Sequence, residues 1–236
     1  MTVSVGPGWE IGPGWVLGAG AGGPVLNNLT MYLDADNSAS YPGSGSTWYD
    51  ISGNNADITL TNSPTYTGTS PGYFTFNGSN QYGTGSTAGV LNNSSYTKSL
   101  WFYLNAYADN NLSSSQAGGH FIFMGPGLNK VYCGHTDWPN YLAYQSTGTF
   151  NLNTWYYLAL TFDTTVGMTL YVNGVQDSTY TANLSPFTGD GSTNIATFGG
   201  SNLLNGRMSK AFFYNARLTS GEILQNYNST KAAYGY

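Results

Sequence analysis

Short runs of alternating apolar and polar residues recur from Leu29 onward, and clusters of Gly, Asn, Asp and Pro separate them. Successive clusters are roughly 8 to 15 residues apart, a spacing typical of antiparallel strands joined by tight turns. Aromatic residues make up 16% of the chain and Gly contributes 32 residues, a composition that also favours strands and turns over long helices. The sequence therefore predicts an all-β, antiparallel sandwich.

The alternation places seven strands. We expect them at Thr30 to Leu33, Gly72 to Phe76, Ser99 to Leu104, Gly119 to Met124, Tyr141 to Gln145, Trp155 to Phe162 and Met168 to Val172. Asn173-Gly174 follows the last of these and supplies two residues that tolerate positive φ, as a type I′ hairpin turn requires. In the strand from Trp155, the side chains of Tyr156, Leu158, Leu160 and Phe162 share one face, which we expect to be core.

A short helix is predicted near the C-terminus. Thr219 and Glu222 have the spacing of a capping box, in which each side chain accepts a hydrogen bond from a backbone N–H of the other residue. Leu218 and Ile223 occupy the positions of a hydrophobic staple across that cap. Ile223, Leu224 and Tyr227 share one helical face, so we expect this helix to lie on an apolar surface.

Six segments of this chain, in order, resemble those of the laminin-G-like branch of the concanavalin A-like lectin/glucanase superfamily. They lie within about residues 29 to 234 and are Trp48 to Asn54, Phe74 to Tyr82, Leu100 to Phe102, Trp155 to Asp163, Leu170 to Gly174 and the closing stretch Asn205 to Tyr227. The resemblance implies a jelly-roll β-sandwich with one short C-terminal helix. Because one scaffold hosts many functions, it does not by itself imply an activity.

Residues 1–28 differ in composition from the rest and are predicted to form an arm, with the sandwich spanning 29–236. Gly6-Pro-Gly-Trp9 recurs as Gly12-Pro-Gly-Trp15, with Ile11 and Leu17 in equivalent places. So short a repeat cannot bury its own Trp and Ile side chains. One interpretation is a disordered leader. The other is an assembly arm, carried by Trp9, Ile11, Trp15 and Leu17, that orders against another subunit.

The charge pattern excludes several partner classes. Only 7% of residues are charged, and the 6 Lys and Arg residues are scattered without a basic stripe, so we expect no nucleic-acid partner.

No apolar run approaches the roughly 20 residues of a spanning helix, so we expect no membrane insertion. The single Cys133 allows no intramolecular disulfide, and the first residues do not resemble a secretory signal. We therefore expect folding in a cytoplasm.

Carboxylates suited to catalysis are scarce. Glycosidases use two carboxyl groups flanking the scissile bond. The only glutamates are Glu10, in the arm, and Glu222, which the capping box uses. Asp34 and Asp36 would lie on one face of a strand about 7 Å apart, within the range of an inverting pair, although such residues more often end a strand. The sequence favours a protein without enzymatic activity.

Two metal hypotheses arise. Cys133, His135 and Asp137 alternate in sequence and would share one face if extended, with His120 available elsewhere; the alternative is a buried thiol with polar residues at a loop end. The resemblance implies calcium as the usual ion, but Asn77 and Gln81 stand where relatives often carry Asp. A strong calcium site is therefore not expected and no cofactor is required, although Asp50, Asp57 or Asp163 could join a weak Ca²⁺ site.

Asp137-Trp138-Pro-Asn140-Tyr141 combines aromatic faces with amide and carboxylate groups, as carbohydrate recognition requires. The alternative is that Trp138 and Tyr141 only pack this loop. Three functions remain open: a non-catalytic virion structural protein, a free carbohydrate-binding lectin or adhesin, and an unusual glycoside hydrolase.

The first function is favoured because the chain lacks a signal, a disulfide and catalytic material and carries a repeat suited to docking. In its low charge, this chain also resembles laminin-G-like domains that occur in phage structural proteins. This resemblance implies a capsid decoration, head-fibre or tail-associated subunit on a virion surface, assembled in the host cytoplasm. The arm would contact other virion proteins or further copies of the chain in an oligomeric assembly, and the sandwich could touch cell-surface glycans.

Overall fold

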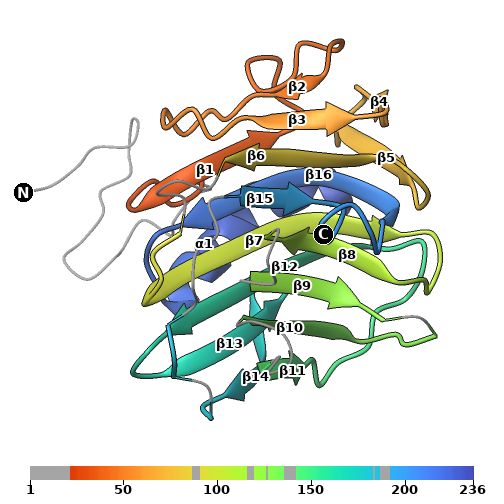
Figure 1. Ribbon diagram of the computed structural model, residues 1–236. Coiled ribbons are helices and arrows are strands. Elements are labelled where there is room, and N and C mark those ends of the chain that lie inside the picture. Colours follow the sequence, from red (N-terminus) through yellow and green to blue (C-terminus); the bar gives the residue numbers. More distant parts are fainter. Residues whose placement is uncertain are drawn as a thin grey trace, which may run out of the picture.

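The computed structural model describes residues 22–86, 91–115, 120–125, 127–135, 142–182, 184–186 and 192–236. Within them, two eight-stranded sheets face each other in a sandwich (Figure 1). The predicted all-β fold is confirmed. All seven predicted strands are present, each with boundaries shifted by at most a few residues.

The first sheet has β7 and β16 at its centre, and all its strand pairs are antiparallel. Its order is β14 (Val175–Tyr180), β13 (Gly167–Val172), β12 (Trp155–Asp163), β7 (Ser95–Leu104), β16 (Asn205–Tyr214), β5 (Tyr73–Asn77) and β4 (Thr65–Thr67), with β1 (Leu29–Asp34) also paired to β16. The predicted hairpin joins β13 to β14, where Asn173 and Gly174 have φ values of 50° and 78°. The type I′ prediction is thereby confirmed.

The second sheet is also antiparallel throughout. Its order is β11 (Leu142–Gln145), β10 (Val131–His135), β9 (His120–Met124), β8 (Asn110–Ser114), β15 (Ser192–Ile195), β6 (Tyr82–Ser86), β3 (Ile58–Thr61) and β2 (Thr47–Trp48). The central pairing of β8 with β15 joins residues about 80 positions apart in the chain.

The main core lies between the two sheets. Leu158, Leu160 and Phe162 are fully buried there and Tyr156 packs against them, which confirms the predicted core face of that strand. Its other face is also buried, because Tyr157 and Ala159 belong to a second apolar cluster on the outside of the first sheet. The strand is thus covered on both sides.

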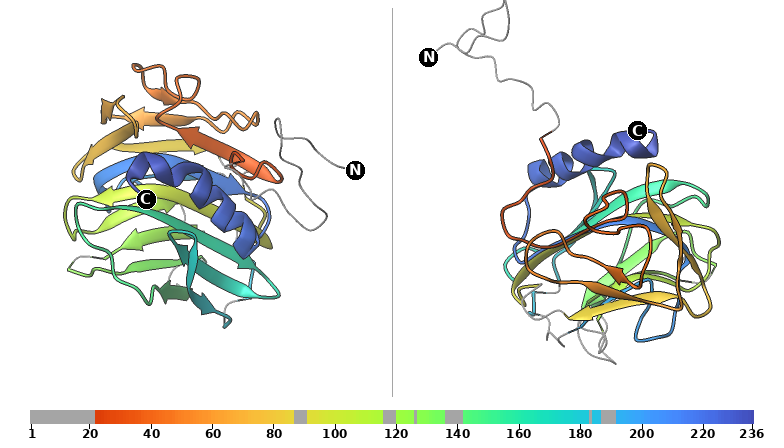
Figure 2. Two further views of the ribbon diagram at one scale, coloured as in Figure 1. Left: turned by 180° about the vertical axis from the view of Figure 1, so that it is seen from behind. Right: turned by 90° about the horizontal axis from the view of Figure 1, so that it is seen from above.

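Helix α1 (Ser220–Thr230) covers the outside of the first sheet (Figure 2), and the short 3₁₀ helix η1 (Lys231–Tyr234) continues it. The Thr219–Glu222 capping box forms as predicted, and Leu218 and Ile223 share the second cluster. One prediction was wrong: Leu224 remains 43% exposed. Asn226 takes its place on the buried face.

The Asn226 side chain is buried because it serves two partners. Its Oδ1 accepts from the Val25 N–H at 2.7 Å, and its Nδ2 donates to the Tyr214 hydroxyl at 2.9 Å. Gln225 also donates to the Gly23 carbonyl at 3.1 Å. Residues 23–25 therefore dock on α1.

The proposed arm residues Trp9, Ile11, Trp15 and Leu17 lie outside the described residues. In the part of the chain that is described, neither helix is long and apolar enough to cross a membrane.

Candidate functional site

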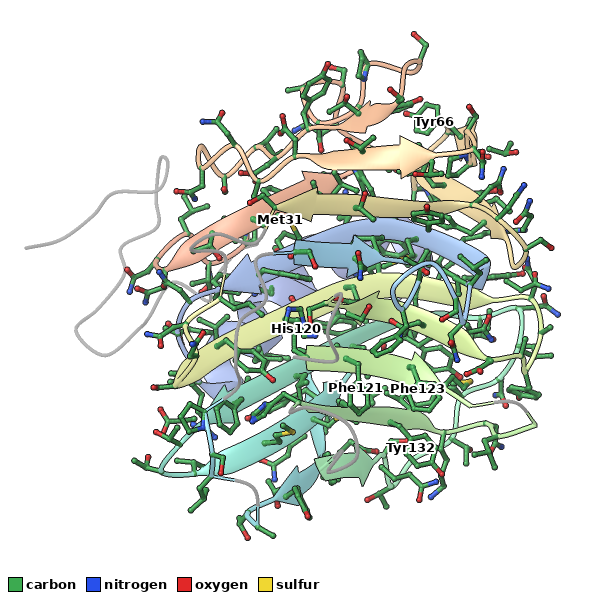
Figure 3. The ribbon with its side chains drawn as sticks, viewed as in Figure 1. Met31, Tyr66, His120, Phe121, Phe123 and Tyr132 are labelled. Carbon is green, nitrogen blue, oxygen red and sulfur yellow. The ribbon has the colours of Figure 1, made fainter. Side chains whose placement is uncertain are left out.

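The outer face of the second sheet carries a row of aromatic side chains. In β9, Ile122 and Met124 point into the core, so Phe121 and Phe123 face outward, since side chains alternate along a strand. In β10, Val131 and Cys133 are core residues, and Tyr132 faces outward for the same reason. Figure 3 shows Phe121, Phe123 and Tyr132 side by side on these two strands.

These rings contact one another both across the two strands and along β9. Phe123 and Tyr132 are directly opposite in the register, and their ring centroids are 5.5 Å apart with an interplanar angle of 34°. Phe121 and Phe123 meet edge to face at 5.9 Å. The Tyr132 hydroxyl accepts a hydrogen bond from the Gln145 amide at 2.8 Å. Phe121 is buried, whereas Phe123 and Tyr132 are half-buried and expose part of their rings.

Amide and hydroxyl groups adjoin the rings, although Asn111, Ser114 and Asn194 are themselves buried. Asn111 of β8 pairs with Phe123, Ser114 pairs with Phe121, and Asn194 of β15 pairs with Ser114. The Asn194 Nδ2 donates to Ser114 Oγ at 3.4 Å, and Ser114 Oγ donates to the Thr197 carbonyl at 2.6 Å. We call this surface the aromatic-amide face; its members are Phe121, Phe123, Tyr132, Asn111, Ser114 and Asn194.

The arrangement suits a ligand that is apolar on one side and rich in hydroxyl groups at its rim. The partly exposed rings of Phe123 and Tyr132 offer their faces to such a ligand, and the exposed Gln145 amide beside them can fix its orientation. The polar row continues across the sheet from Asn194 through Thr84, Thr59 and Thr47, each opposite the next in the register.

The carbohydrate site predicted from the sequence, Asp137, Trp138, Asn140 and Tyr141, lies outside the described residues. In sequence it falls between β10 and β11, two strands of the same sheet. The aromatic-amide face was missed. The Phe121 and Phe123 spacing within a predicted strand was an available signal, but no strand was predicted at β10, and the pairing of β8 with β15 cannot be read locally.

A second group of aromatic side chains lies on the outside of the first sheet, but contacts within the group already cover its ring faces. The Arg207 guanidinium lies over the rings of Tyr73 and Tyr103, at 4.9 and 4.3 Å from their centroids. Tyr103 donates to Asn153 Oδ1 at 3.3 Å, and Trp155 packs against Tyr103 with centroids 5.5 Å apart. A cation already covers the ring faces that a ligand would use.

Asp34 and Asp36 are held by structural contacts. Asp34 forms a buried ion pair with Lys210, its register partner on β16, and accepts from the Tyr32 hydroxyl at 2.9 Å. Burial, and then the charge of Asp34, raises the pKa of Tyr32. Asp36 accepts from Ser70 Oγ at 2.8 Å and from the Gly72 N–H at 3.1 Å. Both carboxylates therefore hold strands and turns together.

Cys133 and His135, which the sequence suggested as metal ligands, lie in a buried polar cluster in the core. The His135 ring nitrogens already have partners, the Tyr96 hydroxyl at 3.1 Å and the Ser185 carbonyl at 2.8 Å. Burial raises the pKa of the Cys133 thiol to about 12 and lowers the pKa of His135 to about 4. Asp137 is outside the described residues. Among those described, no group of three or more His, Cys, Asp or Glu side chains could hold a metal ion.

Lys98 completes this cluster. It is fully buried between the sheets, and its Nζ lies 2.9 Å from His120 Nδ1. Burial lowers the pKa of Lys98 from 10.5 to about 7, and burial together with the Lys98 charge lowers the pKa of His120 well below its usual value. The cluster favours neutral side chains.

The residues considered for a weak calcium site bind backbone groups. Asp50 accepts from the N–H groups of Tyr32 and Ser52, at 2.7 and 2.9 Å, and Asp57 accepts from the Asp50 N–H at 2.8 Å. Asp163 accepts from Thr165, and these hydrogen bonds lower its pKa. At the position where relatives often carry Asp, the amides close a loop: Gln81 Oε1 accepts from the Asn77 N–H at 3.1 Å.

A family model described as concanavalin A-like lectin/glucanases superfamily, of the laminin G type, matches residues 77–224, more than half of the chain. The chain belongs to this superfamily. The resemblance inferred from the six sequence segments is thereby confirmed. A search of curated proteins found no match.

Solved structures with a similar fold include botulinum neurotoxin domains. Botulinum neurotoxin type C, whose entry into cells depends on interaction with two ganglioside molecules, matches with a TM-score of 0.69 at 14% identity over 87% of this chain and 52% of its own. The binding domain of neurotoxin DC, solved with rat synaptotagmin II, gives the same values. The type G receptor-binding domain matches with a TM-score of 0.66 at 14% identity, over 85% and 51% of the two chains. This chain thus spans about half of each, and identities this low show the fold alone.

Proposed function

We propose that this protein is a non-catalytic glycan-binding module whose contact surface is the aromatic-amide face. The observation that carries the proposal is the pair of partly exposed Phe123 and Tyr132 rings, which contact each other beside the exposed amide of Gln145 on one sheet face. The botulinum neurotoxin relative that interacts with gangliosides supports the class of ligand. Non-catalysis is supported by the structural contacts of Asp34, Asp36 and Glu222.

In this proposal the rings and amides have separate roles. A sugar ring lies with its C–H face on Phe123 and Tyr132, and its hydroxyl groups exchange hydrogen bonds with the exposed amide of Gln145. Gln145 holds the Tyr132 hydroxyl at 2.8 Å and so limits rotation of that ring, which reduces the entropy lost on binding.

A glycan array probed with the full chain tests the proposal, followed by titration of the best ligand. Phe123→Ala and Tyr132→Ala should each weaken binding at least tenfold, about 1.4 kcal/mol, as expected for central contact residues. Tyr49→Ala is the matched control, because Tyr49 is 43% exposed and lies at the opposite edge, next to β2. Binding unaffected by either ring substitution, or no binding to any glycan, would refute the proposed site.

A virion role is proposed on a separate observation, the Gly-Pro-Gly-Trp repeat. The arm would dock on other virion proteins or on further copies of this chain, and the sandwich would project from the particle. Deletion of residues 1–21 tests this better than deletion of 1–28, because Gly23 and Val25 contact helix α1. Loss of particle incorporation with an unchanged melting temperature supports the role. Unchanged incorporation contradicts it, and the chain would then be a free lectin.

A further inference from the structure

A lysine and an aspartate are buried against each other where β1 pairs with β16. Lys210 of β16 and Asp34 of β1 are register partners, and their side chains are only 7% and 9% exposed. The Lys210 Nζ donates to Asp34 Oδ1. Taking two charges out of water costs free energy that their attraction only partly returns. The same close contact places an amine beside a carboxyl group, which is the arrangement that a reaction between them needs.

Both carboxyl oxygens of Asp34 are also held by donors from its own segment. Oδ2 accepts from the Tyr32 hydroxyl at 2.9 Å, and Oδ1 accepts from the Asp36 N–H at 2.9 Å. Burial raises the pKa of Tyr32, so its hydroxyl keeps its proton. Fixed donors of this kind stabilise the negative charge that develops on a carboxyl oxygen during nucleophilic attack. The Asp34 carboxyl group is thus oriented and polarised beside the amine.

Aromatic rings surround the pair. The Tyr32 ring stacks on Phe212, with centroids 4.6 Å apart. On β7, the register partner of Lys210 is Trp101, whose indole stacks on Tyr234 of η1 with centroids 3.7 Å apart. Such surroundings exclude water and disfavour separate charges. Transfer of one proton from the ammonium to the carboxylate leaves an uncharged amine, which is a nucleophile, beside a carboxylic acid.

We propose that Lys210 and Asp34 form an intramolecular isopeptide bond. The lone pair of Nζ attacks Cγ of the protonated carboxyl group, and the negatively charged Oδ2 of the tetrahedral intermediate accepts the Tyr32 hydrogen bond. The nitrogen passes a proton to Oδ1, the bond between Cγ and Oδ1 breaks, and Oδ1 leaves as water. The amine and the carboxylic acid thus give an amide and one water molecule, and no oxidant or other co-reactant is needed.

The bond would join β1 to β16 across 176 positions of the chain. The chain has one cysteine and therefore no intramolecular disulfide. An isopeptide bond would supply a covalent link that reducing agents do not break. Tension between the segments that precede β1 and follow β16 would then pass through this bond and leave the sandwich between them unextended.

Intact mass spectrometry of the denatured full chain tests the proposal. The wild type should weigh one water molecule less than its sequence requires. Lys210→Met should have its full sequence mass, whereas Lys130→Met, the matched control at another lysine, should keep the loss. Trypsin cleaves after Lys and Arg but not after an acylated lysine. A digest of the wild type should therefore contain peptide 208–217 joined to peptide 1–98, and this readout does not require any variant to fold.

Tyr32→Phe tests the mechanism and keeps both reacting groups. Phe retains the ring that stacks on Phe212, so the melting temperature should stay within a few degrees of the wild type. Loss of the hydroxyl should slow the reaction, and a fraction of the purified variant should keep its full sequence mass. Complete bond formation in this variant would overturn the role of Tyr32. A wild type with its full sequence mass, or a water loss that Lys210→Met retains, overturns the bond itself. None of these outcomes depends on glycan binding.

Discussion

Lys98 makes the stability of this protein depend on pH in a window where few other groups titrate. Burial lowers its pKa from 10.5 to about 7 in the folded state. Between these two values the unfolded chain binds more protons than the folded chain, so the free energy of unfolding rises with pH by at most about 1.4 kcal/mol per pH unit. Over the whole interval from pH 7 to 10.5, the free energy of unfolding rises by about 5 kcal/mol. Below pH 7 the protein lacks all of this stability.

The other titratable groups that face Lys98 leave this window clear. The pKa values of His120 and His135 are lowered, the latter to about 4, so both titrate below pH 6.5. Burial raises the pKa of Cys133 from 9.0 to about 12, which lowers stability as pH rises, but chiefly above pH 9. Burial also raises the pKa of Tyr96 well above 10.0, so this hydroxyl remains protonated. Measurements from pH 7 to 9 therefore isolate Lys98.

We expect Lys98→Met to flatten this dependence. Met fills a similar volume without a charge, and the cost of leaving His120 Nδ1 without its partner is about 1 to 3 kcal/mol. The variant should therefore be about 2 to 4 kcal/mol more stable than the wild type at pH 7, with the difference shrinking toward pH 9.

Urea denaturation at pH 7, 8 and 9 measures this free energy directly. Lys130→Met is the control, because Lys130 is only half-buried and its Nζ donates to the carbonyls of Ser146 and Thr147. The control should keep the wild-type slope. Equal slopes for the wild type and Lys98→Met, or a loss of stability in Lys98→Met at pH 7, would refute the assignment of a charge penalty to Lys98.

Three further changes test local features. Thr219→Ala removes the N-cap of α1 and should cost about 0.5 to 2 kcal/mol in chemical denaturation; no loss would mean that the capping box is not stabilising. Gly174→Ala places a Cβ 3.0 Å from α1 at a φ of +78°, and should lower the melting temperature more than Gly53→Ala, which meets only backbone strain; equal losses would argue against the helix contact. Asp34→Asn leaves Lys210 buried without its charge partner and should cost about 3 to 5 kcal/mol in urea, whereas a cost below 1 kcal/mol would show that the pair is solvated.

The local features were readable in the sequence. The period-2 pattern located seven strands, Asn173-Gly174 located the hairpin, and the Thr219–Glu222 spacing located the helix start. Each depends on contacts among residues fewer than ten positions apart. The incorrect placement of Leu224 came from a nonlocal partner, since Asn226 is buried by the N–H of Val25 about 200 positions away.

The sequence by itself determined the fold class and the residues at its turns and caps, because backbone sterics and side-chain alternation act locally. Only the tertiary structure decided what lies together. The aromatic-amide face exists because β8 pairs with both β9 and β15, and Asp34 became a structural residue because β1 pairs with β16, bringing Lys210 against it from 176 positions away. Strand order and register depend on how two sheets bury their apolar faces together, and that is a property of the packed chain as a whole.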